Sequence, residues 1–293
     1  MVENKAAVYQ NLTQTQLDAE YDNRAKVLNS ADHLQWYADV SKEYRQTALC
    51  ELDVAYGNSK MENLDIFFPD GDNEKKQRPV HVFFHGGYWR ALSKNEFSYV
   101  ARGLMKSNAI CVVMNYDLIP NINMDQLVQQ CRQSLYWVWQ NIEQYGGDRN
   151  HITLSGHSAG GHLVAMMMST DWTRLDDSCP INLVKSGVSI SGLFDLEPIR
   201  LCFLNKSLSL NETSAKNNSP LFYKNESEGE LICYYGSLEG KEYRSQSDRL
   251  AEQWQNTTSA VLNGHDHFSC MRELYDPNSF LAESIQRQLT KKY

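Results

Sequence analysis

A serine between two glycines is the clearest chemical signal in this sequence. It lies in Gly156-His157-Ser158-Ala159-Gly160, between the apolar run "HITLSG" and the helix-like segment "GHLVAMMMST". A G-x-S-x-G pattern in this context is typical of a nucleophile on a sharp, strained turn, where side chains two positions either side of it would collide. We therefore expect Ser158 to be a nucleophile at the carboxyl edge of a sheet. There it would also lie at a helix N-terminus, which favours developing negative charge.

A second glycine pair follows the strand-like run 79–84, in "HGGYWR". Gly86 and Gly87 would let the backbone approach a substrate closely, as in the loop that binds the oxyanion in hydrolases with such a serine turn. We expect the backbone N–H groups of Gly87 and Tyr88, with that of Ala159 directly after the nucleophile, to bind the oxyanion of a tetrahedral intermediate.

The remaining residues of this HGGxW motif have less specific roles. We expect Tyr88 and Trp89 to line the substrate pocket beside the reacting carbon, with burial of Trp89 in the core as an equal alternative. His85 is expected to bond the backbone of the loop rather than to transfer protons.

A nucleophilic serine needs a base, and the base needs an orienting acid. In such hydrolases the chain order is serine, acid, histidine. Glu239 lies three residues after the strand-like "ELICYYG" and is the expected acid, whereas its competitor Glu242 already enters the next helix-like segment. After "SAVLNG", the stretch "GHDHF" offers His265 and His267 as bases, and the pattern alone leaves both open.

Alternating strand-like and helix-like segments must position these residues. Their spacing suits β-α-β crossovers and predicts an α/β fold with a mostly parallel central sheet and helices on both faces. The predicted strands are 62–68, 79–84, 109–116, 151–156, 183–191, 230–236 and 259–264, and the predicted helices are 14–50, 123–145, 161–170, 245–255 and 279–289.

One segment breaks the alternation. Residues 196–229 are rich in Ser and Asn and have no clean period, so we expect an excursion above the sheet that forms a cap or lid. No linker divides the chain, so we expect residues 1–293 to form a single domain.

Composition excludes several classes of function. The formal charge of −8 argues against a nucleic-acid backbone or an anionic membrane surface as the main partner. The N-terminus has no apolar leader, no run approaches about 18 apolar residues, and the cysteines are scattered singly. We therefore expect a cytoplasmic protein without a membrane span, acting on a small molecule. The oligomeric state, including a homodimer, stays open.

Taken together, five stretches resemble the kynurenine formamidase (arylformamidase) family of α/β-hydrolases: "HGGYW", "GHSAGGH", "SGLFDLEPI", "EGKEYRSQS" and "DHF". The resemblance extends over nearly the whole chain and includes the N-terminal "LDAEYDNR". It matches the histidine before phenylalanine to His267. It also places the triad acid at Glu239, where the family usually has aspartate.

The resemblance implies hydrolysis of N-formyl-L-kynurenine to L-kynurenine and formate, without a metal or other cofactor. A carboxylesterase of the hormone-sensitive-lipase type is the main alternative, because it would use the same triad and a similar HGG loop. That group usually has a third glycine or a small residue where this chain has Tyr-Trp. A non-catalytic binding protein of the same fold is a further alternative, but such proteins typically lose the serine or the histidine.

Overall fold

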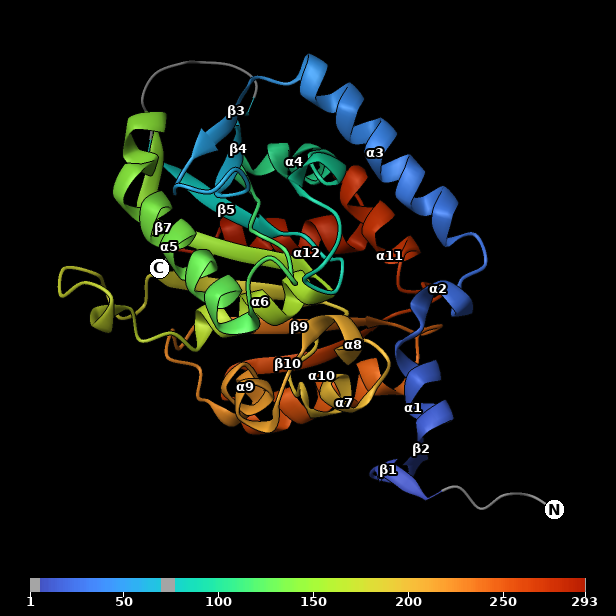
Figure 1. The fold of residues 1–293 in the computed structure, drawn as a ribbon. Helices are drawn as coiled ribbons and strands as arrows, with labels where there is room; N and C mark the ends of the chain where they lie inside the picture. The colour runs from blue at the N-terminus through green and yellow to red at the C-terminus, as the bar shows by residue number, and fades with distance from the viewer. Residues whose placement is uncertain (1–5, 70–76, 293) are drawn as a thin grey trace.

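The structure is a computed structural model that describes residues 6–69 and 77–292. Its centre is an eight-stranded sheet with the order β10-β9-β8-β7-β5-β6-β4-β3 (Figure 1). The six strands from β10 to β6 pair in parallel, whereas β4 runs antiparallel to both of its neighbours, so the sheet is mostly parallel as predicted. The strands are β3 (Cys50–Ala55), β4 (Asn63–Phe67), β5 (Arg78–Phe84), β6 (Ile110–Met114), β7 (Gly147–His157), β8 (Val184–Ile190), β9 (Glu230–Gly236) and β10 (Thr257–Leu262).

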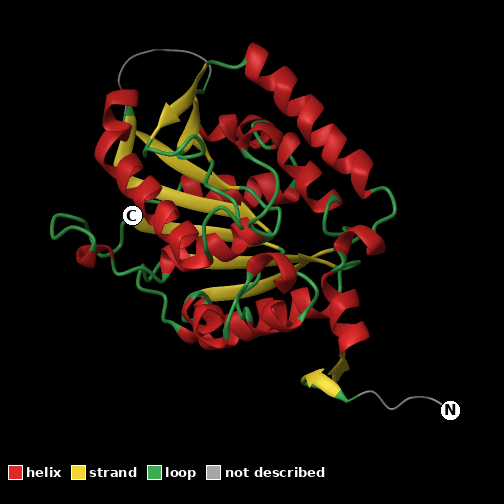
Figure 2. Cartoon of the chain, viewed as in Figure 1, coloured by secondary structure: helices red, strands yellow, loops and turns green. Residues whose placement is uncertain are grey.

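Helices cover both faces of this sheet (Figure 2). They are α1 (Gln14–Tyr21), α2 (Asn23–Lys26), α3 (Ser30–Thr47), α4 (Tyr99–Leu104), α5 (Met124–Asn141), α6 (Ala159–Met168), α7 (Glu197–Leu201), α8 (Asn205–Leu208), α9 (Glu212–Asn217), α10 (Lys241–Gln253), α11 (Ser269–Arg272) and α12 (Phe280–Leu289). Short 3-10 helices are η1 (Lys94–Glu96), η2 (Met105–Ser107), η3 (Ile142–Tyr145), η4 (Trp172–Arg174), η5 (Pro220–Phe222) and η6 (Glu273–Tyr275), and a separate hairpin joins β1 (Ala7–Tyr9) to β2 (Leu12–Thr13). No helix within the described ranges has the length and apolar character needed to cross a lipid bilayer.

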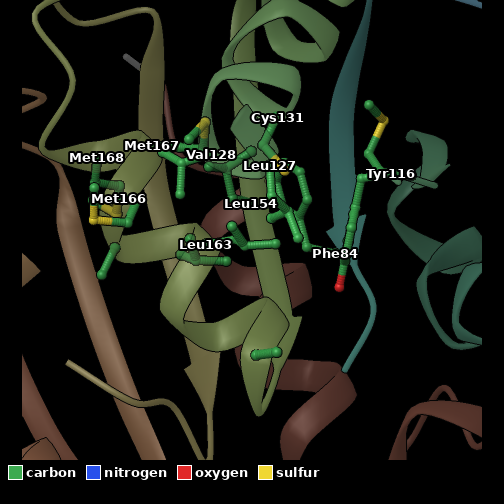
Figure 3. Packing of buried hydrophobic residues seen from close by; sticks show 14 of the residues in the cluster. Phe84, Tyr116, Leu127, Val128, Cys131, Leu154, Leu163, Met166, Met167 and Met168 are labelled. Carbon is green, nitrogen blue, oxygen red and sulfur yellow. The ribbon is translucent and has the colours of Figure 1, made fainter. Parts of the chain in front are cut away.

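Two apolar clusters, one on each face of the sheet, form the core. Because successive strand residues point to opposite faces, Val82 and Phe84 of β5 pack into the first cluster and Phe83 into the second. The first cluster includes residues of α5, α6 and α10, and the second includes residues of α3, α4 and α12. Figure 3 shows part of the first cluster, with Phe84, Leu127, Leu154 and Leu163 labelled.

The helix predicted over 123–145 is present as α5 followed by η3. The side chain of Asn123 caps its N-terminus by accepting a hydrogen bond from the amide of Gln126. The segment ends at Gly146, whose φ of +83° lies in the left-handed region that glycine adopts without strain. The apolar residues whose spacing predicted the helix are all buried: Leu127, Cys131, Leu135, Val138 and Ile142.

The N-terminal region is more divided than predicted. Residues 14–50, predicted as helical, form α1, α2 and α3 and lead directly into the edge strand β3. Most side chains of β3 are exposed, so the strand lacks the buried face whose alternating pattern would have revealed it. In Figure 1 these helices (blue) lie along the side of the molecule toward which the parallel strands point.

The irregular segment 196–229 folds as α7, α8, α9 and η5, between β8 and β9. Ser219 closes it internally, because its hydroxyl accepts from the amide of Leu196 at 2.8 Å and donates to the carbonyl of Ala215 at 2.7 Å. Ile199 and Leu208 join the first apolar cluster. The segment therefore consists of short helices that pack against the first apolar cluster.

Candidate active site

Ser158 occupies the turn between β7 and α6. Its φ of +57° and ψ of −116° are strained values for a residue with a side chain. The glycines two positions before and after Ser158 are both required, because the backbone packs closely against each of them. A Cβ on Gly156 would lie 2.3 Å from the carbonyl oxygen of Gly160, and a Cβ on Gly160 would lie 2.0 Å from the carbonyl oxygen of Phe84. The amide of Ser158 donates to the carbonyl of Ile190 at 2.8 Å and ties the turn to the next strand.

The loops after β9 and β10 bring Glu239 and His267 to this serine. His267 Nε2 lies 3.1 Å from Ser158 Oγ, and His267 Nδ1 lies 2.5 Å from Glu239 Oε1. With its proton on Nδ1, the His267 ring donates a hydrogen bond to the Glu239 carboxylate, and its unprotonated Nε2 can accept a hydrogen bond from the Ser158 hydroxyl. The second carboxylate oxygen accepts from the Ser191 hydroxyl at 2.8 Å and the Gly236 amide at 2.6 Å, which fixes its orientation.

The two competing residues lie elsewhere. His265 Nε2 is 3.1 Å from a carboxylate oxygen of Glu273, outside the contact with the serine. Glu242 accepts from the hydroxyl of Tyr21 at 3.2 Å, and burial raises the pKa of this carboxyl group. The structure therefore brings together the residues that the resemblance indicated and separates the alternatives.

A second histidine, His157, lies beside His267 with 4.7 Å between the ring centroids. Burial and the neighbouring imidazole hold the pKa of His157 well below its ordinary value, so this ring is neutral. Its Nε2–H donates to the carbonyl of His267 at 2.8 Å. His157 thus supports the backbone that carries His267.

The loop after β5 passes close to the nucleophile. A Cβ on Gly86 would lie 2.9 Å from the carbonyl oxygen of His157 and 3.3 Å from the Cβ of Ser158. Gly87 has a φ of +112°, and a Cβ there would lie 2.0 Å from the carbonyl oxygen of Ala91. Only glycine permits this approach of backbone to reaction centre.

Three amides near the serine are available to a ligand. The N–H groups of Gly87, Tyr88 and Ala159 have no hydrogen-bond acceptor in the part of the chain that the structure describes. Tyr88 has a φ of +50°, a strained value for a bulky residue. Ala159 is fully buried, and Gly87 and Tyr88 are half-buried at the edge of the cavity. Because unpaired amides are rare in protein interiors, these three fit a role in binding an oxygen of the substrate.

His85 holds the loop as expected. Its Nδ1 donates to the carbonyl of Gly86 at 2.8 Å, and its ring stacks on Tyr116 with 4.2 Å between centroids. Burial lowers the pKa of His85 to about 4, so the ring is neutral near pH 7.

Trp89 does not line the substrate pocket, which corrects one sequence-based expectation. Its side chain is fully buried, and Nε1–H donates to Nδ1 of His162 at 3.2 Å. Burial lowers the pKa of His162 to about 4, and the opposite nitrogen of this neutral ring donates to the carbonyl of Asn218 at 2.7 Å. Trp89 therefore anchors the loop to α6 and to the segment 196–229.

A cavity of about 410 Å³ opens at Ser158 and His267. Tyr88 lines it as predicted, together with Gly87, and Phe203 and Leu204 of the segment 196–229 contribute to its wall. Phe268 of the "DHF" stretch also lines the cavity, as do four apolar residues that the sequence analysis did not single out: Leu34, Tyr37, Leu92 and Phe97. A pocket of this size with aromatic walls and a few polar groups suits a small aromatic ligand.

The N-terminal segment supplies a part of this cavity that sequence reasoning missed. Tyr21, Asp22, Asn23 and Arg24 all line it. These residues end the stretch "LDAEYDNR", which belongs to the family resemblance and was the available signal. Among the described residues, no cluster of three or more His, Cys, Asp or Glu side chains could hold a metal ion.

The sheet order, the strand–turn–helix serine and the loops that meet there define an α/β-hydrolase. The BD-FAE family model matches residues 64–253. The chain is 30% identical to the kynurenine formamidase of Danio rerio, over 97% of this chain and 99% of the relative, and 30% identical to that of Salmo salar, over 88% of each. The chain belongs to the kynurenine formamidase family of α/β-hydrolases and is a hydrolase.

Solved structures agree with this fold. A crystal structure described as a candidate thioesterase from a Silicibacter species has a TM-score of 0.82 and 27% sequence identity. The match covers 92% of this chain and 98% of that structure.

Proposed function

We propose that this hydrolase cleaves N-formyl-L-kynurenine to L-kynurenine and formate, with Ser158, Glu239 and His267 as its catalytic triad. The observation that carries the proposal is a match to a kynurenine formamidase along almost the full length of both chains. The distances that connect Ser158, His267 and Glu239 support the mechanism, because nucleophile, base and orienting acid are already within hydrogen-bond reach.

In the first half-reaction, His267 Nε2 takes the hydroxyl proton of Ser158 while Oγ attacks the formyl carbon. Glu239 accepts the Nδ1–H bond and stabilises the imidazolium that forms. The carbonyl oxygen becomes an oxyanion, which the amides of Gly87, Tyr88 and Ala159 bind. Loss of one such donor typically costs about 3–4 kcal/mol of transition-state stabilisation.

Collapse of this intermediate breaks the carbon–nitrogen bond. His267 donates its proton to the departing aniline nitrogen, L-kynurenine leaves, and the formyl group remains as an ester on Ser158. A water molecule then gives a proton to His267 and attacks the ester. Formate departs, and the proton returns to the Ser158 oxygen, which restores the starting state.

The cavity supports an aromatic leaving group. Its aromatic and aliphatic wall can bury a benzene ring. In the proposed mechanism the acyl group lies between Ser158 and the loop after β5, where even a Cβ on Gly86 would lie 3.3 Å from the Cβ of Ser158. The smallest acyl group, formyl, therefore fits best beside the serine.

The direct test is incubation of the purified protein with N-formyl-L-kynurenine, with formate and kynurenine measured together. We expect equimolar products from the wild type. Ser158→Ala should reduce kcat by about three orders of magnitude or more, while circular dichroism shows an intact fold.

Absence of kynurenine from the wild-type reaction would reject the substrate. A Ser158→Ala variant that retains more than about a tenth of the wild-type kcat would reject the nucleophile, because a factor of ten is only about 1.4 kcal/mol. Turnover of short acyl esters alone would instead support the carboxylesterase alternative.

A further inference from the structure

We propose that the turn formed by residues 21–24 recognises the amino-acid head of the substrate, with Arg24 binding its α-carboxylate and Asp22 its α-ammonium group. This inference rests on the proposed function, since N-formyl-L-kynurenine carries both charges at the end of the ketone side chain that is ortho to the reacting formamide. The turn lines the same cavity as Ser158 and His267.

The charges of the cavity support an anionic group in the ligand. Its lining includes two cations, Arg24 and Arg90, and one carboxylate, Asp22, although the whole chain has a net charge of −8. This lining is therefore positive in an otherwise acidic protein, which favours a carboxylate-bearing ligand.

Arg24 is the better placed of the two cations. Arg90 already donates to the hydroxyl of Ser207 at 2.7 Å, across to α8. Arg24 has neither a hydrogen bond nor an ion pair to any other described residue, so its guanidinium is available for a carboxylate. Two parallel N–H···O bonds between these planar groups would give both strength and orientation.

Asp22 presents the complementary charge. One of its oxygens accepts from the amide of Ala25 at 3.1 Å and caps α2. The other oxygen is left for a ligand ammonium group. A cation and an anion two residues apart on one turn match the two charges of an α-amino acid.

The turn is fixed to the catalytic machinery by a network of hydroxyl groups. The side-chain amide nitrogen of Asn23 (Nδ2) donates to the hydroxyls of Tyr88 at 2.9 Å and Tyr243 at 2.7 Å. Tyr88 in turn donates to the main-chain carbonyl of Tyr21 at 2.7 Å, which leaves the hydroxyl of Tyr243 to donate to that of Tyr88 at 2.8 Å.

This network connects both halves of the site. Tyr88 belongs to the loop with the free amides, and the ring of Tyr243 lies 4.8 Å from that of His267. The head-binding turn is therefore held at a fixed place relative to the reacting atoms. Such preorganisation is what a recognition element requires.

The test compares two substrates that share the formamide and the aryl ketone. N-formyl-L-kynurenine carries the amino-acid head, and 2-formamidoacetophenone lacks it. For Arg24→Gln, we expect the ratio of kcat/KM for the full over the truncated substrate to fall about tenfold, mainly through KM. Arg24→Lys should recover part of this loss, because it restores the charge without the planar fork.

Two further variants sharpen the result. Asp22→Asn removes the carboxylate but keeps a good cap for α2, and it should lower the same ratio about threefold. Lys26→Gln is the matched control, because Lys26 lies on the same helix, pairs with Glu20 at 3.7 Å and lies outside the cavity with Ser158. The substrate ratio of Lys26→Gln should equal that of the wild type.

An Arg24→Gln variant whose substrate ratio is unchanged, or a Lys26→Gln variant with the same loss, would overturn the proposal. Calorimetric titration with L-kynurenine separates this failure from that of the proposed function, because it needs no turnover. If the wild type hydrolyses neither formamide, about tenfold weaker L-kynurenine binding by Arg24→Gln would still support head recognition. Equal binding by both proteins would reject it.

Discussion

The carboxyl edge of the sheet and the N-terminal helices contribute to the same cavity in different ways. The edge supplies Ser158, Glu239 and His267 from three loops, each placed directly after a parallel strand. The N-terminal region supplies the turn 21–24, which reaches the site across the fold. Asn23, for example, bonds Tyr243 from 220 positions away in the sequence.

With the roles proposed above, this difference separates the residues for chemistry from the residues for recognition. Strand ends fix the reacting groups, because parallel strands bring their following loops to one edge. The turn 21–24 instead adds side chains that can distinguish one leaving group from another. Substitutions at the edge should therefore reduce kcat for every substrate, whereas substitutions in the turn should change the preference among substrates.

The largest effect is expected at the histidine. His267→Ala should lower kcat by about ten-thousandfold, because the serine loses its base. His265→Ala should stay within about threefold of the wild type, since His265 pairs with Glu273 and lies away from Ser158. Steady-state kinetics of both variants on one formamide measures the contrast, and the opposite ranking would move the base to His265.

The orienting acid should have the next largest effect. Glu239→Gln should lower kcat by about a thousandfold, because the amide cannot stabilise the imidazolium as a carboxylate does. Glu242→Gln should change kcat less than threefold, since an amide oxygen can still accept the bond from Tyr21. If Glu242→Gln proves the more damaging, the acid assignment is wrong, and if both variants resemble the wild type, Asp248 becomes the next candidate.

A smaller effect should reveal the connection between the two regions. Tyr88→Phe removes the hydroxyl that joins Tyr21, Asn23 and Tyr243. We expect kcat to fall about tenfold with little change in KM, because the oxyanion loop would lose its fixed position. The control is Tyr223→Phe, because Tyr223 is an exposed residue whose hydroxyl, among the described residues, donates to the carbonyl of Asn217 alone. An equal decrease in both variants would show that Tyr88 has no positioning role.

The same contrast explains what the sequence could predict. The turn at Ser158 is specified locally, because its strained backbone demands glycine on both sides. The strand before it and the helix after it have clear periodicity. The strand before Glu239 also has a clear apolar pattern, so Glu239 could be predicted from the end of that strand. The choice of His267 over His265 could not be made from the local pattern and needed the family resemblance.

The missed features depend on long-range packing. Nothing in the local pattern of residues 21–24 shows that they would meet Tyr88 and Tyr243. The burial of Trp89 likewise depends on His162, which lies 73 positions away. Such contacts follow from how the elements pack, and periodicity does not contain that information.

The most direct test of the account is a comparison of kcat/KM for N-formyl-L-kynurenine, its N-acetyl analogue and a butyrate ester. We expect an acetyl methyl group to meet the loop after β5, because its backbone lies so near the nucleophile that a Cβ on Gly86 would be 3.3 Å from the Cβ of Ser158. Overpacking of this kind costs about 1–3 kcal/mol, which corresponds to a rate loss of roughly 5- to 150-fold. We predict that the formyl substrate exceeds its acetyl analogue by that factor. A butyrate ester that reacts well while the formamide shows no turnover would contradict the account and identify the protein as a carboxylesterase.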